Sequence, residues 1–184
     1  PYISRGVISL PMVKAAVLNK FSPSQSEKLM QELAWREYWQ RAWEAKGDAI
    51  FTDLKQAQAG VVHQEVPAAI VDAGTGITAI DSSIRELYAT GYMHNHCRMY
   101  VAAITCNMAR SHWWQPSRWL YYHLLDGDLA SNCLSWQWVA GTFSSKKYYC
   151  NQENINKYCN TNQQDTFLDK AYEVLPCMGV PESL

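Results

Sequence analysis

Apolar residues recur along most of this chain at the spacing of an α-helix. Ile80, Ile84, Leu87 and Tyr88, for example, follow i, i+4, i+7 and i+8, which places them on one helical face. No stretch shows the sustained apolar–polar alternation of a half-buried strand, and no internal repeat is present. The pattern therefore predicts an all-α fold in which residues 1–184 form one domain.

Capping residues divide the pattern into separate helices. Ser22 with Gln25, or Ser24 with Glu27, forms a capping signature for a helix that Gly47 ends. Further helices are predicted over residues 78–90, 93–111, 116–126, 128–140 and 166–175.

The expected N-caps of two of these helices are Thr78 and Asp128. Residues 50–76 hold several Gly and Pro, so we expect a long connection with at most a short helix. Residues 142–165, rich in Asn, Gln and Tyr, are expected to be irregular or to form short helices.

Composition narrows the class of protein. A chain of 184 residues with 48% hydrophobic and 18% charged residues can bury a core, which excludes a disordered tail. The net charge of −1 creates no global positive field, so any nucleic-acid binding must come from a local patch. The chain has eight Trp and eleven Tyr but only four Phe. Binding sites for flat ligands favour Trp and Tyr, although packing in the core is the simpler explanation.

Cysteine spacing and the N-terminal residues predict a compartment. The six cysteines form no CxxC pair, so we expect free thiols in a reducing, cytoplasmic protein. No signal peptide is visible, and no apolar stretch reaches the roughly 20 residues that span a bilayer. The chain starts at Pro1, which indicates either a removed initiator Met or a piece of a longer protein.

The helix that begins near Ser22 has an unusual face. Glu32, Trp35, Arg36, Trp39 and Trp43 lie at i, i+3, i+4, i+7 and i+11, where a core face would be aliphatic. One interpretation is a wet surface with a Glu32–Arg36 ion pair worth only about 0.3–0.5 kcal/mol. The other is a ligand cleft with indole stacking plates and charges that recognise polar edges.

Two further helices also carry grouped polar and apolar side chains. Asn95, Arg98 and Met99 share one face, and Asn132 and Trp136 share another. The neighbouring His94, His96 and Cys97 are not expected to bind a metal, because i and i+2 point about 200° apart on a helix. Capping explains Asp128 but gives no reason for Asp126.

Four motifs in order over about a hundred residues together resemble one family. They are Glu-Leu-x-Trp-Arg-Glu-Tyr (32–38), Thr-Gly-Tyr-Met-His-Asn-x-x-Arg-Met (90–99), Asp-Gly-Asp-Leu-Ala-x-Asn (126–132) and Trp-Gln-Trp (136–138). The chain resembles the α-helical FAD-binding domain of the photolyase/cryptochrome family. The resemblance implies a single irregular helical cluster with FAD as cofactor, incomplete at its N-terminus. The family's antenna domain is absent from this sequence, and so is the Ser/Thr-rich phosphate loop.

The resemblance implies cofactor-binding roles for five residues. Asn132 matches the residue that faces the flavin N5, and Arg98 and Asp126 match a charge pair beside the isoalloxazine. Asp128 matches a contact to the polar edge of the flavin, and Arg36 matches a residue near the cofactor's phosphates.

A second set of roles concerns a pyrimidine dimer that is flipped out of DNA and split by an electron from excited reduced flavin. Glu32 matches the carboxylate partner of the lesion, and Trp35 and Trp138 match its stacking walls. Asn95 and Met99 match positions that complete this pocket. The implied activity is that of a deoxyribodipyrimidine photo-lyase, with damaged DNA as partner.

Trp136 and Trp113 match two members of the family's photoreduction chain. The usual third Trp falls in residues 58–72, where this sequence has none. The candidates for its replacement are a Tyr or one of the extra indoles, Trp39, Trp43, Trp114 and Trp119. The basic residues of a DNA-binding face are few, namely Arg110, Arg118, Lys146 and Lys147.

Three hypotheses follow from these observations. The first is light-driven DNA repair, the second is a cryptochrome-like blue-light photoreceptor with a protein partner, and the third is a helical remnant without flavin. The retained lesion-pocket residues favour repair over signalling, whereas the near-zero net charge opposes DNA binding.

Overall fold

The computed structural model describes residues 1–184 as a set of helices without strands. The α-helices are α1 (Leu10–Leu18), α2 (Pro23–Lys46), α3 (Ala68–Val71), α4 (Thr78–Thr90), α5 (Asn95–Ala103), α6 (Trp114–His123), α7 (Leu129–Ala140) and α8 (Gln152–Cys159). Short 3₁₀ turns cover Gly47–Phe51 and Leu175–Cys177, and a π-helical segment, Ile104–Met108, continues α5. The predicted all-α class is confirmed.

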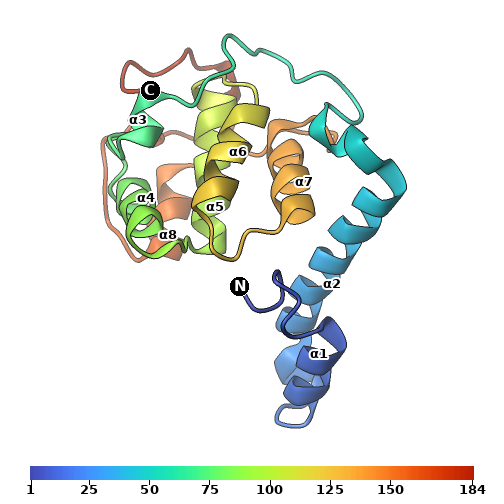
Figure 1. The fold of residues 1–184 in the computed structure, drawn as a ribbon. Helices are drawn as coiled ribbons and strands as arrows, with labels where there is room; N and C mark the ends of the chain where they lie inside the picture. The colour runs from blue at the N-terminus through green and yellow to red at the C-terminus, as the bar shows by residue number, and fades with distance from the viewer.

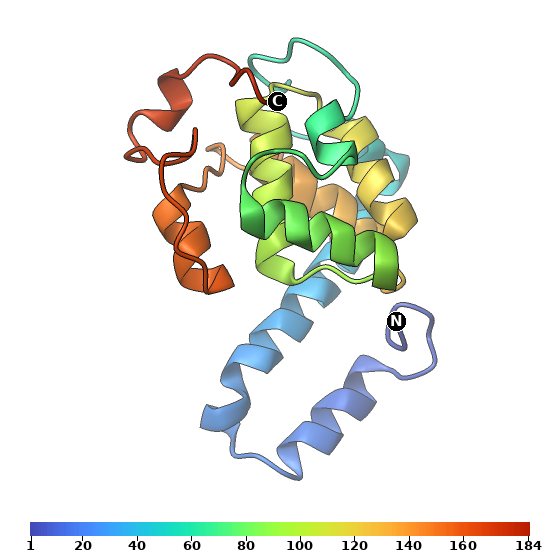
Figure 2. The same ribbon diagram turned by 90° about the vertical axis from the view of Figure 1, so that its left-hand side faces the viewer.

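The helices fall into a body and an arm. Helices α3–α8 form the body, whereas α1 and α2 form a hairpin that extends away from it (Figure 1). The view in Figure 2 shows the same separation, with the C-terminal half of α2 against the body. The N-terminal segment folds back toward the body, and the Ser4 hydroxyl donates to the Asp126 carbonyl oxygen at 2.8 Å.

The core lies where α4, α5, α6 and α7 meet. Ile80, Ile84 and Leu87 are buried, as the spacing predicts. Tyr88, the fourth residue of that pattern, is at the edge, and its hydroxyl donates to the Val71 carbonyl oxygen. The largest completely buried side chain is that of Trp113, so part of the Trp surplus does fill the core.

The caps explain where the main helices begin and end. Ser22 and Gln25 form the predicted capping box of α2, and Asp128 accepts the Ser131 N–H at 2.9 Å to cap α7. Gly91 ends α4 with φ of +71°, and an added Cβ there would lie 2.4 Å from the Leu125 side chain.

Several predicted boundaries are wrong. Ile77, not Thr78, is the N-cap residue of α4, and the Thr78 N–H donates to the Gln163 side chain at 2.8 Å. The long helix predicted over 93–111 is α-helical only to Ala103, because the backbone then shifts to π-helix. The helix predicted over 116–126 ends at His123.

The helix predicted over 166–175 is absent, and the real last α-helix is α8. Asn151 caps α8 by accepting the Asn154 N–H at 3.0 Å. Residues 166–168 instead support the start of α8: the Gln152 N–H donates to the Leu168 carbonyl oxygen, and the Thr166 hydroxyl donates to the Gln152 side chain. Helix α1, which Ser9 caps, was not predicted from the sequence.

All six cysteines are free thiols, and four of them are buried. Burial raises the pKa of Cys133 and of Cys150 to about 12, so both thiols stay protonated at neutral pH. No helix of the structure is long and apolar enough to cross a membrane.

Candidate functional site

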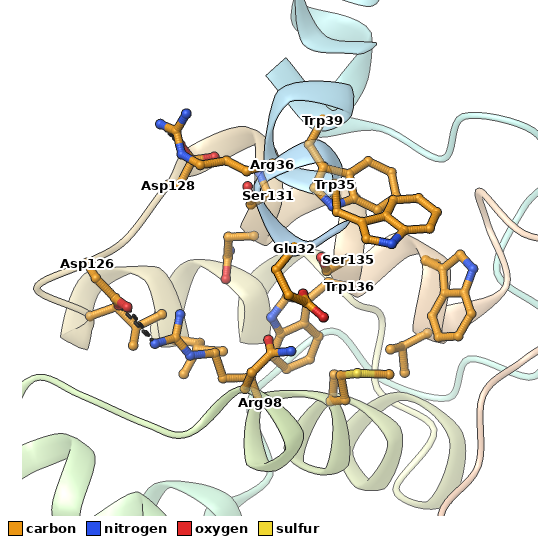
Figure 3. A pocket seen from close by; sticks show the side chains of 18 residues that line it. Glu32, Trp35, Arg36, Trp39, Arg98, Asp126, Asp128, Ser131, Ser135 and Trp136 are labelled. Carbon is orange, nitrogen blue, oxygen red and sulfur yellow. Dashed lines mark hydrogen bonds and ion pairs between the residues drawn. The ribbon is translucent and has the colours of Figure 1, made fainter. Parts of the chain in front are cut away.

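A cavity of about 470 Å³ opens between α2, α5 and α7 (Figure 3). Eleven of the twelve residues singled out from the sequence line it, and Trp113 is the exception. These eleven are Glu32, Trp35, Arg36, Asn95, Arg98, Met99, Asp126, Asp128, Asn132, Trp136 and Trp138. Segments up to about a hundred residues apart in sequence therefore meet at one site.

Helix α2 supplies one wall of the cavity. Glu32, Trp35, Arg36 and Trp39 line it, so the unusual face of this helix belongs to a cleft. The Trp35 and Trp39 rings stack with centroids 5.6 Å apart and an interplanar angle of 27°. Trp35 is 55% exposed, which leaves its ring available to a ligand. Trp43 does not line the cavity.

The Glu32–Arg36 ion pair considered from the sequence is not formed. The Glu32 carboxylate lies 4.0 Å from the Lys28 ammonium, and its side chain is 52% exposed. The Arg36 guanidinium instead contacts Asp128, 92 residues further along the chain, at 2.7 Å. Arg36 pairs with Asp128 because that carboxylate is largely buried. An exposed i,i+4 pair with Glu32 would gain little free energy over hydration of the two charges.

The Arg36–Asp128 ion pair joins α2 to the start of α7. The Gln40 amide also donates to Asp128 and lies 2.9 Å from both carboxylate oxygens. The Arg36 and Asp128 side chains are 25% and 11% exposed. The Nε of Arg36 is buried and has no hydrogen-bond partner. The role of Gln40 was not predicted from the sequence, because a polar residue on a helix indicates no function until its distant partner, here Asp128, is known.

A second ion pair lies on the opposite side of the site. The Arg98 guanidinium donates to both Asp126 carboxylate oxygens at 2.9 and 2.8 Å, and each side chain is 24% exposed. The Arg98 Nε donates to the Met93 carbonyl oxygen at 2.7 Å, which fixes the guanidinium plane. This contact gives Asp126 the role that capping could not supply.

Helix α7 supplies the floor. The Asn132 amide donates to the Ser117 carbonyl oxygen at 2.9 Å, and Trp136 is almost completely buried. Trp138 is 40% exposed and packs on Tyr148, with ring centroids 5.6 Å apart. Trp136 and Trp138 both line the cavity although they are two residues apart on this helix.

Trp113 lies in the core beside the site. Its indole N–H donates to the Asp53 carboxylate at 2.7 Å, and its ring contacts that of Trp114 with centroids 5.4 Å apart. His112 lies 3.3 Å from the same Asp53 oxygen. Of the four substitute indoles, Trp114 is the one that the structure brings against Trp113.

The His94–His96 geometry differs from the prediction. His94 lies outside α5 as its N-cap, so the two rings do not point apart but stack with centroids 5.3 Å apart. No group of three His, Cys, Asp or Glu side chains is arranged to hold a metal ion.

Three of the four basic residues considered for DNA contact have partners within the chain. Arg118 donates to the Gln115 side-chain oxygen at 3.5 Å and lies over the Trp114 ring. Lys147 donates to the Ala59 carbonyl oxygen at 2.6 Å, and burial lowers its pKa. Arg110 donates to the Met178 carbonyl oxygen at 3.0 Å. Arg118 and Lys146 remain exposed.

The cavity of this helical domain combines aromatic rings, two ion pairs and a buried donor without a partner, an arrangement that suits a flat, charged ligand. Comparison with known proteins identifies the family. Residues 29–173 match the family described as the FAD binding domain of DNA photolyase, and the chain belongs to this family. The expected cofactor, FAD, is the one that this family binds.

Individual relatives agree with this assignment. The deoxyribodipyrimidine photo-lyase of Synechococcus sp. is 36% identical over 115 residues, which cover 61% of this chain and 24% of that protein. The photo-lyase of Halobacterium salinarum is 28% identical over 159 residues, covering 81% of this chain and 33% of that protein. The chain therefore spans about a quarter to a third of the length of these curated relatives.

Solved structures share the fold. A cryptochrome from Synechocystis sp. superposes with a TM-score of 0.75 at 25% identity, over 86% of this chain and 35% of that one. An archaeal photolyase from Sulfolobus tokodaii, solved with two FAD molecules, gives a TM-score of 0.63 at 24% identity. That match covers 72% of this chain and 32% of the archaeal one.

Proposed function

We propose that this chain is the catalytic part of a light-driven DNA repair enzyme that splits cyclobutane pyrimidine dimers. The observation that carries the proposal is the convergence of the predicted cofactor and lesion residues on one cavity. The curated relatives named deoxyribodipyrimidine photo-lyases support the same activity.

The cavity fits FAD in its donor set. Arg98 and Asp126 supply a charge pair for the isoalloxazine, and Asn132 supplies an amide for its N5. Arg36 offers a buried Nε–H that no protein acceptor satisfies. FAD, when bound, supplies the light absorption and the electron; these side chains hold it and neutralise its charge.

The lesion subsite occupies the more open side of the same cavity. Trp35 and Trp138, which are both partly exposed, are the stacking walls, since a flipped pyrimidine dimer needs apolar faces of this kind. Glu32 is exposed enough to hydrogen-bond the dimer's polar edge. Asn95 and Met99 complete the subsite from α5.

Trp136 and Trp113 form the inner members of an electron path, and both lie in one hydrophobic core. Trp114 is the candidate for the outer member because its ring contacts that of Trp113. The Asp53 carboxylate, which accepts the Trp113 indole N–H, stabilises positive charge on that ring.

A cryptochrome-like photoreceptor is the second candidate, favoured by the structural match to the Synechocystis cryptochrome. Such a receptor shares the flavin site but turns over no lesion and passes its light state to a protein partner. The two functions therefore differ at the lesion subsite and agree at the flavin site.

The test is dimer splitting by the purified chain after reconstitution with FAD. We expect a flavin absorption spectrum and light-dependent loss of pyrimidine dimers from an oligonucleotide, measured at low salt, where phosphate contacts are strongest. The Glu32→Gln variant should lose most of this activity and keep its flavin spectrum. A matched control is Glu44→Gln, because Glu44 lies on the same helix, exposed and away from the cavity.

Three outcomes contradict the repair proposal in different ways. Flavin photoreduction without dimer loss identifies a photoreceptor. Equal dimer loss in wild type and Glu32→Gln would show that Glu32 does not contribute to the splitting of the lesion. A colourless protein after reconstitution identifies a helical remnant.

A further inference from the structure

The Asp128 carboxylate uses its hydrogen-bonding capacity within the protein. One oxygen accepts the Ser131 N–H and the Gln40 amide, and the other accepts Arg36 and the same Gln40 amide, all within 2.9 Å. These contacts come from three donors, because a single Gln40 nitrogen lies 2.9 Å from both oxygens. Asp128 therefore acts as an anchor between α2 and α7 in this arrangement.

Gln40 is placed to tie two helices together. It lies one turn after Arg36 on the same face of α2, and it contacts the residue that caps α7. Only one residue of α2, Ser26, is buried, so apolar packing fixes this helix weakly against the body. Polar contacts across to α7 must then set where the Arg36 side chain lies.

The Arg36 guanidinium has one buried donor without a partner. Its terminal nitrogen contacts Asp128 at 2.7 Å, whereas its buried Nε has no acceptor in the protein. A buried donor without a partner costs free energy, so an acceptor is expected to reach it in the functional state. Arg36 lines the cavity, so this acceptor is expected to come from a ligand bound there.

We propose that Gln40 is a positioning residue: its amide holds Asp128, and through it Arg36, so that the Arg36 Nε–H points at an acceptor atom of FAD. Gln40 itself does not line the cavity and acts through Arg36. The inference rests on one part of the proposed function, the binding of FAD, and does not depend on the repair reaction.

The test compares FAD dissociation constants of three variants by fluorescence titration. Gln40→Met keeps the length of the side chain and removes the amide donor, so the Kd should rise about tenfold, the effect expected from loss of a hydrogen bond to a charged group. The matched control is Gln31→Met on the same helix, where an exposed amide bonds only Glu27 at 3.2 Å. Its Kd should equal that of wild type.

A pH series separates positioning from packing. In Gln40→Glu the new carboxylate lies against Asp128, and the like charge raises its pKa. The Arg36 guanidinium opposes this rise, but it is already paired with Asp128 at 2.7 Å. At alkaline pH it is charged and repels Asp128, so FAD binding should be weak. As the pH falls it gains a proton and donates as the amide does, so affinity should return toward wild type. A side chain that only fills space produces no such pH dependence.

The outcomes are distinct. A wild-type Kd in Gln40→Met, or a Gln40→Glu to wild-type Kd ratio that is constant with pH, overturns the inference and leaves the repair proposal intact. A wild-type chain that binds FAD and splits no dimers overturns the repair proposal and leaves the Gln40 comparison intact. Absence of FAD binding by the wild type overturns both. Thermal unfolding of the FAD-free proteins checks that each variant is folded.

Discussion

Helices α2 and α7 face each other across the site, yet they are held in place by different forces. Helix α2 has 24 residues, of which only Ser26 is buried, whereas seven of the 12 residues of α7 are buried. Both helices nevertheless contribute side chains to the same cavity. The floor of the site is thus part of the hydrophobic core, and its wall is not.

Because the two helices are held differently, we expect α7 to contribute mainly to stability and α2 mainly to ligand binding. Packing around α7 involves completely buried side chains such as Leu134, whose loss leaves a cavity. The position of α2 depends on polar contacts such as Arg36–Asp128, whose loss moves the wall without unfolding the body. Mutations in α7 should therefore lower stability first, and mutations in α2 should lower ligand affinity first.

The largest expected effect is that of Leu134→Ala on α7. We expect a loss of about 2–5 kcal/mol in the free energy of unfolding, because the site is completely buried. Leu29→Ala on α2 is the matched change at a residue that is 44% exposed, and it should cost less than about 1 kcal/mol. Urea denaturation measures both, and equal losses would refute the contrast between the helices.

Next in size is the removal of Asp126, which leaves Arg98 without its carboxylate. Asp126→Ala should cost about 1–3 kcal/mol, as for a charged hydrogen bond in a partly buried site. It should also weaken FAD binding, because the charge pair lines the cavity. A double-mutant cycle with Arg98→Ala isolates the pair, and a coupling free energy near zero would contradict this assignment.

A smaller effect should appear in alkaline solution and should come from α7. Burial raises the pKa of Cys133 to about 12, from 9.0 for a free thiol, so the unfolded chain ionises first. The stability that the neutral thiol contributes is complete below about pH 9 and is lost as pH rises toward 12.

The check is the urea midpoint of wild type and Cys133→Ala from about pH 7 to about pH 11. The difference in stability between them should narrow as pH rises. Helix α2 contains no cysteine and makes no such contribution. A pH-independent difference would show that the thiol is not protected in the folded state.

The smallest expected effect is that of Arg41→Ala on the outer face of α2. Contacts with Glu37 and Glu44 raise the Arg41 pKa, but the group is exposed to solvent and the ion pairs are screened. We expect an unchanged melting temperature and unchanged FAD affinity. A clear loss of either would mean that the outer face of α2 has a partner.

Much of the site could be predicted from the sequence because helical periodicity is local. The face of α2 that carries Glu32, Trp35 and Arg36 follows from residue spacing, and the caps Ser22 and Asp128 follow from residue type. The order of the four motifs identified the family, and the family match over residues 29–173 confirms it.

The tertiary structure alone decided which side chains pair. Spacing favoured Glu32 as the partner of Arg36, but the folded chain brings Asp128 there instead. Gln40 and Asp53 gained their roles in the same way, from partners 88 and 60 residues away. The sequence by itself thus determined the helices and the faces they present. The pairing of those faces depended on the packing of distant segments, because contact between them depends on the position of the whole backbone and not on local spacing.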